Sequence, residues 1–224
     1  MRRRSGCACA RLLIIFNGVW RIQTHRNRAP REPVVVLADK YEIQEILFTE
    51  EQIASRVGEL ADMITGDFEG TAPLMVGILK GAFIFLADLA RRVRVPAEFD
   101  FMAFSSYGSG TKTSGVVRVL KDLSTDIAGR HLILVEDIVD SGLTLSYLLR
   151  DLKARGAASL SICALLNKEV ARQVDLPIRY EGFTIPDVFV VGYGLDCAEQ
   201  YRNLPYIASV KKLAGEPPAP RLFP

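Results

Sequence analysis

The chain has 224 residues, a formal net charge of +2, 49% hydrophobic residues and 24% charged residues, values that suit a single soluble domain with a full core. No apolar run is long enough to cross a bilayer as a helix, and four scattered cysteines are too few for a disulfide framework. These features exclude a helical membrane protein and a disulfide-stapled secreted domain, so we expect a cytoplasmic protein.

The first 31 residues differ in charge from the rest of the chain. They hold eight of the 28 basic residues and no acid, which leaves 20 basic against 26 acidic residues, a net charge of −6, in the remainder. The apolar stretch 12–20 is interrupted by Asn17 and Gly18, so it makes a poor secretory signal. An organelle presequence also fits, and a nucleic-acid-binding tail is the weaker alternative. We expect residues 1–33 to be a disordered extension or a start assigned too far upstream.

The remainder alternates apolar strand-like segments with helical segments. Thr49 and Gln52 form a capping box, which predicts a helix through about Ile64. A second helix is predicted over residues 82–93, and a mobile Gly/Ser/Thr-rich loop over residues 107–114. Other apolar runs predict strands at residues 74–79, 99–105, 116–120, 160–166 and 188–191. This alternation predicts a mainly parallel sheet covered by helices.

The most informative segment is LILVEDIVDSGLTL, residues 132–145. A predicted strand over residues 131–136 ends in Glu136 and Asp137, and a helix is predicted over residues 143–155. Ligands of open α/β sheets bind beyond the carboxyl ends of the strands. A loop with hydroxyls and free backbone N–H groups at a helix start suits a phosphate. The acids need sugar hydroxyls or a divalent cation between themselves and that phosphate, so the segment predicts a phosphorylated sugar with Mg²⁺.

Two other interpretations fit this segment. It could be a strand–helix turn without a ligand, and the acid pair also fits the phospho-acceptor strand of a receiver domain. A receiver domain needs a second acidic cluster early in the chain, whereas this motif lies past mid-chain. No GxxxxGK[ST] pattern occurs, and the glycines at 108, 110 and 115 have the wrong spacing for a dinucleotide loop.

The segment VEDIVDSGLTL resembles the phosphoribosyl-pyrophosphate (PRPP) loop of type I phosphoribosyltransferases. LMVGILKGAFIFLADL, SSYGSG, LLNK and PDVFVVGYGLDCAEQYRNLPYI resemble bacterial hypoxanthine-guanine phosphoribosyltransferases, from about Tyr41 to about Lys212. The resemblance implies a type I phosphoribosyltransferase fold, with a central mainly parallel sheet, flanking helices and a small hood. We expect this domain over residues 34–213, with a hood from the N-terminal helix region and the C-terminal strands, and a frayed tail at 214–224.

The resemblance also implies an activity. PRPP would donate its 5-phosphoribosyl group to hypoxanthine or guanine, giving IMP or GMP and pyrophosphate, with Mg²⁺ and without nucleic-acid or membrane partners. A homodimer or homotetramer is expected. Two alternatives remain open: a same-fold enzyme that uses xanthine or a pyrimidine, and a PRPP-sensing regulator that binds nucleic acid. The acidic body without an added DNA-binding segment disfavours the regulator. The preference between hypoxanthine and guanine is left open.

For the phosphoribose side, the resemblance implies that Glu136 and Asp137 face the ribose hydroxyls and the metal. The 5′-phosphate would be wrapped by a run of small loop residues, namely Asp140, Ser141, Gly142, Leu143 and Thr144. Asp140 is also the implied general base beside N7 of the purine. From the sequence pattern alone, Asp140 would be the N-cap of the following helix. Leu143 departs from the family, which often has a polar residue there.

For the base side, the resemblance implies that Lys168 donates to the purine O6, that Phe189 stacks on the purine and that the Val190 backbone pairs with the base edge. On pattern alone, Lys168 is a surface lysine and Phe189 a core residue. Asp196 would sit near the base as a further metal-contacting acid.

The remaining expected contacts concern pyrophosphate. Arg202 would bind it. Apart from pyrophosphate, Arg172 matches a supporting basic residue of the family, and Cys197 stands where the family commonly has an aromatic residue. Lys80 and Gly81 would form a pyrophosphate loop preceded by a cis Leu79–Lys80 peptide. Ser106 and Tyr107 would form a lid that excludes water from the reacting sugar.

Overall fold

The computed structural model describes residues 12–16, 19–23, 41–106 and 117–212. The chain divides into two compact units, residues 1–36 and 37–224. In the first unit, β1 (Leu12–Phe16) and β2 (Val19–Gln23) pair as antiparallel strands, where the sequence predicts no regular structure. The predicted loop at 107–114, the tail at 214–224 and the rest of residues 1–33 lie outside the described residues, so these expectations stay predictions.

The second unit is built on a six-stranded sheet with the order β6-β5-β4-β7-β8-β9. Its strands are β4 (Leu74–Leu79), β5 (Glu98–Ser106), β6 (Val117–Lys121), β7 (His131–Val139), β8 (Ser159–Asn167) and β9 (Ile178–Thr184). All neighbours are parallel except β5 and β6, which confirms the predicted mainly parallel sheet. The chain order reverses between β4 and β7, which is where open α/β sheets bind ligands.

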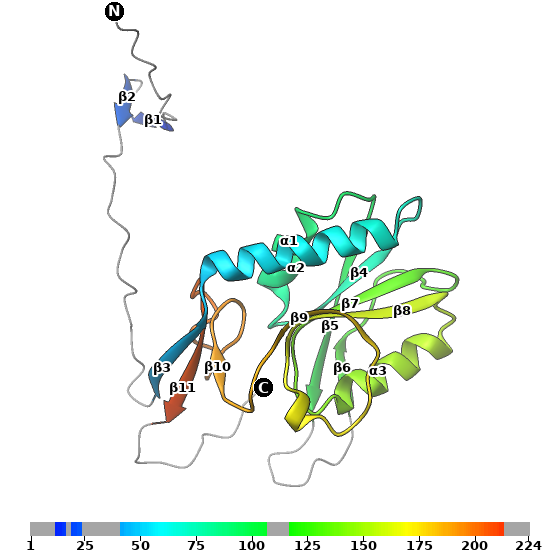
Figure 1. The fold of residues 1–224 in the computed structure, drawn as a ribbon. Helices are drawn as coiled ribbons and strands as arrows, with labels where there is room; N and C mark the ends of the chain where they lie inside the picture. The colour runs from blue at the N-terminus through cyan, green and yellow to red at the C-terminus, as the bar shows by residue number, and fades with distance from the viewer. Residues whose placement is uncertain (1–11, 17–18, 24–40, 107–116, 213–224) are drawn as a thin grey trace, which may run out of the picture. The chain divides into compact units, whose positions relative to one another are not determined.

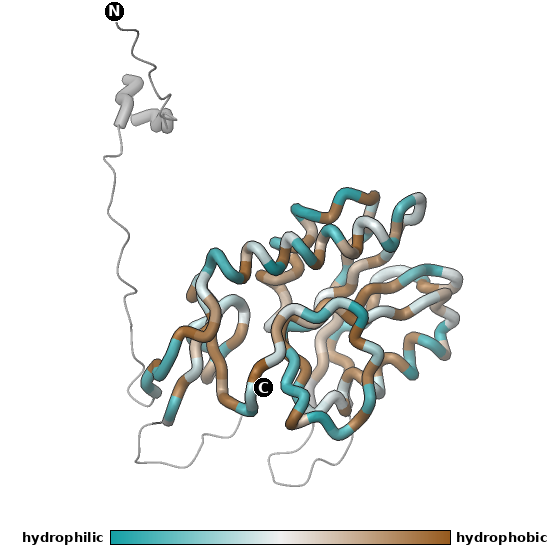
Figure 2. Tube along the Cα trace, viewed as in Figure 1, coloured by the Kyte–Doolittle hydropathy of each residue, from teal (hydrophilic) through white to brown (hydrophobic). Residues whose placement is uncertain are grey.

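Helices cover both faces of this sheet (Figure 1). On one face, α1 (Glu50–Asp67) and α2 (Phe83–Ala90) pack with the strands in one apolar cluster that includes Leu60, Phe85 and Cys163. On the other face, α3 (Leu143–Ala154) buries Leu145, Leu148 and Leu152 against the sheet. Figure 2 shows the mixed hydrophilic and hydrophobic colouring of α1 that one buried face requires.

The first helix begins where the capping box predicts. The Thr49 side chain accepts from the Gln52 N–H at 3.3 Å, and Gln52 Oε1 accepts from the Thr49 N–H at 2.9 Å. Most boundaries lie within three residues of the sequence-based expectation, and two of the differences concern elements next to the site. Helix α2 is shorter than residues 82–93, and β7 continues through Asp137 to Val139, because Ile138 and Val139 still pair with β8. The acid pair therefore lies inside the end of the strand rather than in the loop.

A small second sheet forms the hood, with the order β10-β11-β3. Its strands are β3 (Tyr41–Phe48), β10 (Val190–Val191) and β11 (Ile207–Lys212), all antiparallel. The N-terminal part contributes strand β3 to this sheet, which was not predicted as a strand, whereas α1 packs on the central sheet. Of the predicted strand at 188–191, only Val190 and Val191 form a strand, β10, and it belongs to the hood and not to the central sheet. The Phe48 and Phe183 rings stack with centroids 4.0 Å apart, which ties β3 to β9.

Candidate active site

The carboxyl ends of β4, β7 and β8 share one edge of the sheet because these strands are parallel neighbours. Directly after these ends come residues 80–82, which we call the Lys80 loop, residues 140–142, which we call the Asp140 loop, and Lys168. The backbone N–H of Lys168 donates to Val139 O at 2.9 Å, and that of Gln173 donates to Ser141 O at 3.0 Å. These bonds hold the loop after β8 against the loop after β7.

The acid pair at the end of β7 is poorly solvated. Glu136 Oε2 is buried and has no hydrogen-bond partner among the described residues. Burial, and then the neighbouring Asp137 carboxylate, raise the pKa of Glu136 well above its ordinary value. Burial raises the pKa of Asp137 to about 6, although its Oδ1 accepts from the Ile138 N–H at 3.0 Å and Arg202 acts in the opposite direction. A buried carboxylate without a partner is costly, so this pair favours binding a proton, a cation or hydroxyl donors.

Gly81 allows the preceding loop to approach this pair. A Cβ on Gly81 would lie 1.6 Å from Asp137 Oδ2, so no other residue fits there without moving the carboxylate. The Leu79–Lys80 peptide is cis, as the family resemblance implies. The backbone of the Lys80 loop and the acid pair therefore form one wall of the site.

The turn into α3 has the features of an anion site. Gly142 is the N-cap with φ +77° and no side-chain capping bond. The expected capping role of Asp140 is therefore wrong, and its side chain is exposed at the loop. Leu143 and Thr144 are also exposed, and the Leu143 N–H meets only Ser141 Oγ, at 3.5 Å. The first turn of α3 thus offers backbone donors to an anion.

Residues 192–202, which we call the Asp196 arm, reach the same edge from the hood. Their backbone is unusual, because Tyr193, Ala198, Glu199 and Tyr201 all have positive φ. Backbone strain of this kind clusters at ligand sites. Sequence reasoning did not find it, because none of these residues is a glycine or an asparagine.

Arg202 organises the arm. Its guanidinium donates to Gly194 O at 2.8 Å and pairs with Asp196 at 2.9 Å and with Glu199 at 3.4 Å. Its Nε is buried without a partner among the described residues. Lys80 Nζ lies 3.1 Å from Glu199 Oε2, so Glu199, which the sequence analysis missed, links the arm to the Lys80 loop.

The base side combines a buried cation with an exposed ring. The Lys168 side chain is buried, and its Nζ lies 3.1 Å from Asp187 Oδ1. Phe189 is 45% exposed, so the assignment of this ring to the core on pattern alone was wrong. Val190 pairs with Ser209 of β11. Lys168 directly follows β8 of the central sheet, whereas Val190 belongs to the hood strand β10 and Phe189 directly precedes it.

A polar group that sequence reasoning missed supports the Lys168 segment. Asn167 is buried, donates to Glu181 Oε2 at 2.9 Å and accepts from Arg172. Arg172 Nε is buried without a partner among the described residues. The only sequence signal was a polar residue at the end of an apolar strand. Arg172 therefore acts on the loop through Asn167. In the predicted lid, Tyr107 and the Ser106 side chain lie outside the described residues.

The predicted metal set does not form a complete cage. Among the described residues, no three His, Cys, Asp or Glu side chains are grouped to hold a metal ion. Asp196 is held by Arg202 and by the Glu199 N–H at 2.8 Å. The orphaned Glu136 Oε2 beside Asp137 nevertheless fits Mg²⁺, which takes one or two carboxylates and completes its shell with water and substrate oxygens. No helix in the described part of the chain could cross a membrane.

Comparison with known proteins agrees with this geometry. The profile of the phosphoribosyl transferase domain matches residues 44–198. The chain is 48% identical over 177 residues to the hypoxanthine-guanine phosphoribosyltransferase of Bacillus subtilis, covering 79% of this chain and 98% of that protein. It is 51% identical over 175 residues to the Mycobacterium tuberculosis enzyme of the same name, covering 75% and 87%.

The structural comparison points the same way. The crystal structure of a hypoxanthine-guanine phosphoribosyltransferase from Bacillus anthracis matches with a TM-score of 0.72 and 47% identity, covering 76% of this chain and 99% of that one. The chain therefore belongs to the phosphoribosyl transferase domain family and, within it, to the hypoxanthine-guanine phosphoribosyltransferases. The predicted family and fold class are confirmed.

Proposed function

We propose that this chain is a purine salvage enzyme that transfers the 5-phosphoribosyl group of PRPP to hypoxanthine or guanine, giving IMP or GMP and pyrophosphate. One observation carries this proposal. The buried Glu136–Asp137 pair, in which Glu136 Oε2 has no hydrogen-bond partner among the described residues, adjoins an uncapped helix N-terminus. Ribose hydroxyls can donate to the former, and the 5′-phosphate can accept from the latter. The names of its close relatives, hypoxanthine-guanine phosphoribosyltransferases, support the same activity.

The phosphoribose side follows from these two features. Backbone N–H groups at Ser141, Gly142, Leu143 and Thr144, with the hydroxyls of Ser141 and Thr144, hold the 5′-phosphate. Glu136 and Asp137 accept hydrogen bonds from the ribose hydroxyls. Pairing the orphaned Glu136 Oε2 with a donor removes the cost of burying it without one. Ligand binding therefore supplies the hydrogen-bond donor that the buried Glu136 carboxylate lacks.

A divalent cation belongs to this arrangement. Glu136 and Asp137 would hold Mg²⁺, with Asp196 as the further acid. When bound, the ion supplies positive charge that offsets the charge developing on the departing pyrophosphate. On the protein side, Lys80, the Gly81 backbone and Arg202 supply donors to pyrophosphate, and Ser106 and Tyr107 are proposed to cover it.

The base side positions the purine for attack through N9. The Lys168 ammonium has three N–H donors, of which one points to Asp187 Oδ1 3.1 Å away, and it donates another to O6. The exposed Phe189 ring offers a stacking surface, and the Val190 backbone meets the base edge. Asp140 is the general base that accepts the N7 proton as the N9–C1 bond forms.

Steady-state kinetics across a panel of bases tests this function. We expect turnover of hypoxanthine and guanine that depends on both PRPP and Mg²⁺, with pyrophosphate released in equal amount. Equal or better turnover of adenine or uracil would contradict the base assignment. Turnover of xanthine alone would identify the same-fold alternative. A cytoplasmic homodimer or homotetramer remains our expectation, which size-exclusion chromatography with light scattering and cell fractionation would check.

A further inference from the structure

The two loops that face the proposed pyrophosphate site meet at three points. A Cβ on Gly194 of the Asp196 arm would lie 2.1 Å from Gly81 O, so the two backbones are in direct contact. Lys80 Nζ lies 3.1 Å from Glu199 Oε2. The third point is indirect, because the Tyr193 hydroxyl donates at 2.6 Å to Asp88 Oδ2 of α2 and not to the Lys80 loop itself. Helix α2 begins directly after the Lys80 loop, so this bond joins the arm to the element that carries that loop.

Tyr193 stands at an unusual place in the backbone. It has φ +48° and lies between Gly192 and Gly194, whose φ angles are +99° and +102°. Three consecutive residues are thus in a conformation that L side chains rarely adopt. The Tyr193 N–H donates to Leu204 O at 2.8 Å, so the chain that follows Arg202 comes back to the start of the arm. The base of the arm is therefore a closed loop, and the Tyr193 side chain extends from this loop to Asp88 of α2.

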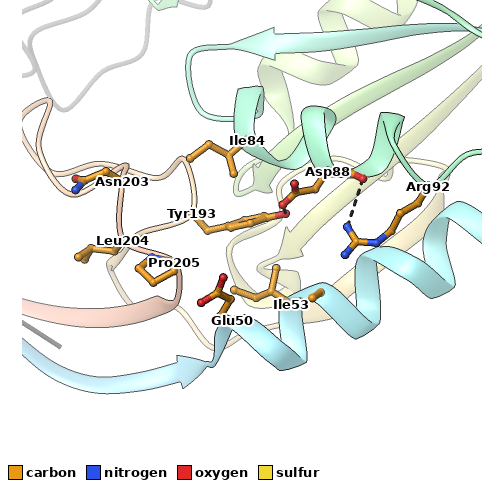
Figure 3. Close-up of a pocket in the computed structure, with 10 residues that line it drawn as sticks. Glu50, Ile53, Ile84, Asp88, Arg92, Tyr193, Asn203, Leu204 and Pro205 are labelled. Carbon is orange, nitrogen blue, oxygen red and sulfur yellow. Dashed lines mark hydrogen bonds between the residues drawn. The ribbon is translucent and has the colours of Figure 1, made fainter. Parts of the chain in front are cut away.

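The ring of Tyr193 is not fixed by packing on every side. It is 6% exposed and contacts the apolar cluster beneath α1 and α2. It also lines a cavity of about 360 Å³ bounded by Ile53, Ile84, Arg92 and residues 203–205 (Figure 3). Because a cavity leaves a side chain room to shift, the hydrogen bond to Asp88 is what fixes the hydroxyl end. Figure 3 shows the Tyr193 hydroxyl directed at the Asp88 carboxylate.

We propose that Tyr193 is a positioning residue, whose hydrogen bond to Asp88 holds the Asp196 arm in register with the Lys80 loop for pyrophosphate binding. This inference rests on the proposed function. Pyrophosphate would take contacts from both loops, namely Lys80 and the Gly81 backbone on one side and Arg202 on the other. A small displacement of one loop against the other separates these contacts, and misplacement of about 1 Å is costly for such sites. Tyr193 touches none of the reacting atoms.

Tyr193→Phe tests the proposal, with Tyr180→Phe as a matched control. The Tyr180 hydroxyl also donates to an aspartate, Asp67 Oδ2 at 2.8 Å, and its side chain is fully buried, but it joins β9 to the end of α1. Both changes remove one buried hydroxyl and its bond to a carboxylate, and Tyr180→Phe also removes the acceptor of the Arg179 Nε bond at 3.2 Å. Only Tyr193→Phe frees the arm.

We expect Tyr193→Phe to raise the KM for PRPP, and the Kd for magnesium pyrophosphate measured by calorimetry, by about tenfold, the scale of one lost hydrogen bond to a charged group. The KM for hypoxanthine at saturating PRPP should change less than about twofold, because the base side does not use the arm backbone. Tyr180→Phe should lower the melting temperature without changing either pyrophosphate-side constant. Equal constants in the two variants would overturn the proposal.

Asp88→Asn gives a second route to the same answer. An amide oxygen accepts less strongly than a carboxylate, so this variant should weaken pyrophosphate binding in the same direction. The double variant should bind pyrophosphate no more weakly than Tyr193→Phe alone, whereas additive effects would show two independent roles. Pyrophosphate calorimetry needs no turnover. If the wild type fails to use 6-oxopurines yet binds pyrophosphate more tightly than Tyr193→Phe, the proposed base specificity fails and the positioning role stands.

Discussion

The phosphoribose side and the base side of the site are built in different ways. Glu136, Asp137 and the phosphate loop lie within one segment of nine residues that runs from the end of β7 into α3. The base side is assembled from the end of β8 and the hood. Lys168 and Phe189 are 21 positions apart in the chain, so only the fold can bring them to one site.

The two sides also differ in how their charges are satisfied. On the phosphoribose side, the acid pair has raised pKa values and an orphaned oxygen. On the base side, Lys168 is already paired with Asp187. The first side therefore gains a missing partner on binding, whereas on the second side the purine binds a cation that already has one. This difference predicts that changes on the first side act on PRPP and changes on the second act on the purine.

Asp140 is the test of largest expected effect. Asp140→Asn should lower kcat on the order of 10²-fold or more, because the amide keeps the size of the side chain but cannot accept the N7 proton. Calorimetric PRPP affinity should change little, since the phosphate contacts are backbone N–H groups. Asp151→Asn, an exposed change on α3, is the control and should leave both constants unchanged. Near-normal kcat in folded Asp140→Asn would remove Asp140 from the chemistry.

Gly81 tests whether the acid pair depends on its close neighbour. Because the added Cβ would lie 1.6 Å from Asp137 Oδ2, Gly81→Ala must displace the carboxylate or the loop. We expect PRPP affinity in the presence of Mg²⁺ to fall by more than about tenfold, a loss above ~1.4 kcal/mol.

Gly58→Ala is the matched control for this substitution. Gly58 lies in α1 with no atom within 4 Å of the new Cβ, so the change should raise the free energy of unfolding by up to about 1 kcal/mol without altering kinetics. Unchanged PRPP affinity in Gly81→Ala would show that the loop adapts and that the tight approach is not needed for binding.

Lys168 tests the base side. Lys168→Ala should lower kcat/KM for hypoxanthine by roughly tenfold or more, because a hydrogen bond from a charged donor contributes about 1.5–3 kcal/mol. PRPP affinity by calorimetry should stay the same. Lys153→Ala on the exposed side of α3 is the control. An unchanged kcat/KM for both 6-oxopurines would exclude Lys168 from base recognition, whereas a loss of PRPP affinity would break the division between the two sides.

The acid pair also predicts a pH dependence. Asp137 has a pKa of about 6 in the folded protein against 3.8 ordinarily, so between about pH 4 and pH 6 the folded state binds more protons than the unfolded state. The free energy of unfolding of the ligand-free protein should therefore fall as pH rises through this window, because ∂ΔG/∂pH follows the difference in bound protons. Glu136, whose pKa is raised too, acts in the same direction.

Urea unfolding at pH 4.5 and pH 7 measures this effect. Asp137→Asn should flatten the pH dependence, and saturating PRPP with Mg²⁺ should reverse it, because the ligand favours the ionised pair. Ligand affinity should accordingly rise with pH through about 6. An identical pH dependence in the wild type and Asp137→Asn would show that Asp137 already has its partners in the ligand-free protein.

Local patterns in the chain were enough to predict the phosphoribose side. The predicted strand at 74–79 has the same bounds as β4, and the predicted helix after the acid loop differs from α3 by one residue. These segments are buried and strongly periodic, so their hydrophobic pattern determines them. The end of β7 was placed too early, because carboxylates inside a strand look like the start of a loop.

The base side was less predictable, because its order comes from distant pairing. Strand β3 is partly exposed and is held by β11, more than 150 positions further along the chain. In β9, the charged Arg179 and Glu181 interrupt the apolar pattern. Neither the Lys168–Asp187 pair nor the positive φ of Tyr193 leaves a signature in residue type. Here the family resemblance, rather than periodicity, placed the site residues.

The N-terminal extension should have the smallest effect on either side of the site. The family profile begins at residue 44, and 79% of this chain covers 98% of the Bacillus subtilis relative. A chain starting at Pro33 should therefore keep its kcat and both KM values, and its melting temperature should stay within a few degrees. Intact-mass measurement of the native protein would show whether residues 1–33 are retained. Aggregation, a drop of several degrees in melting temperature or a changed cellular location would instead give the arginine-rich segment a structural or targeting role.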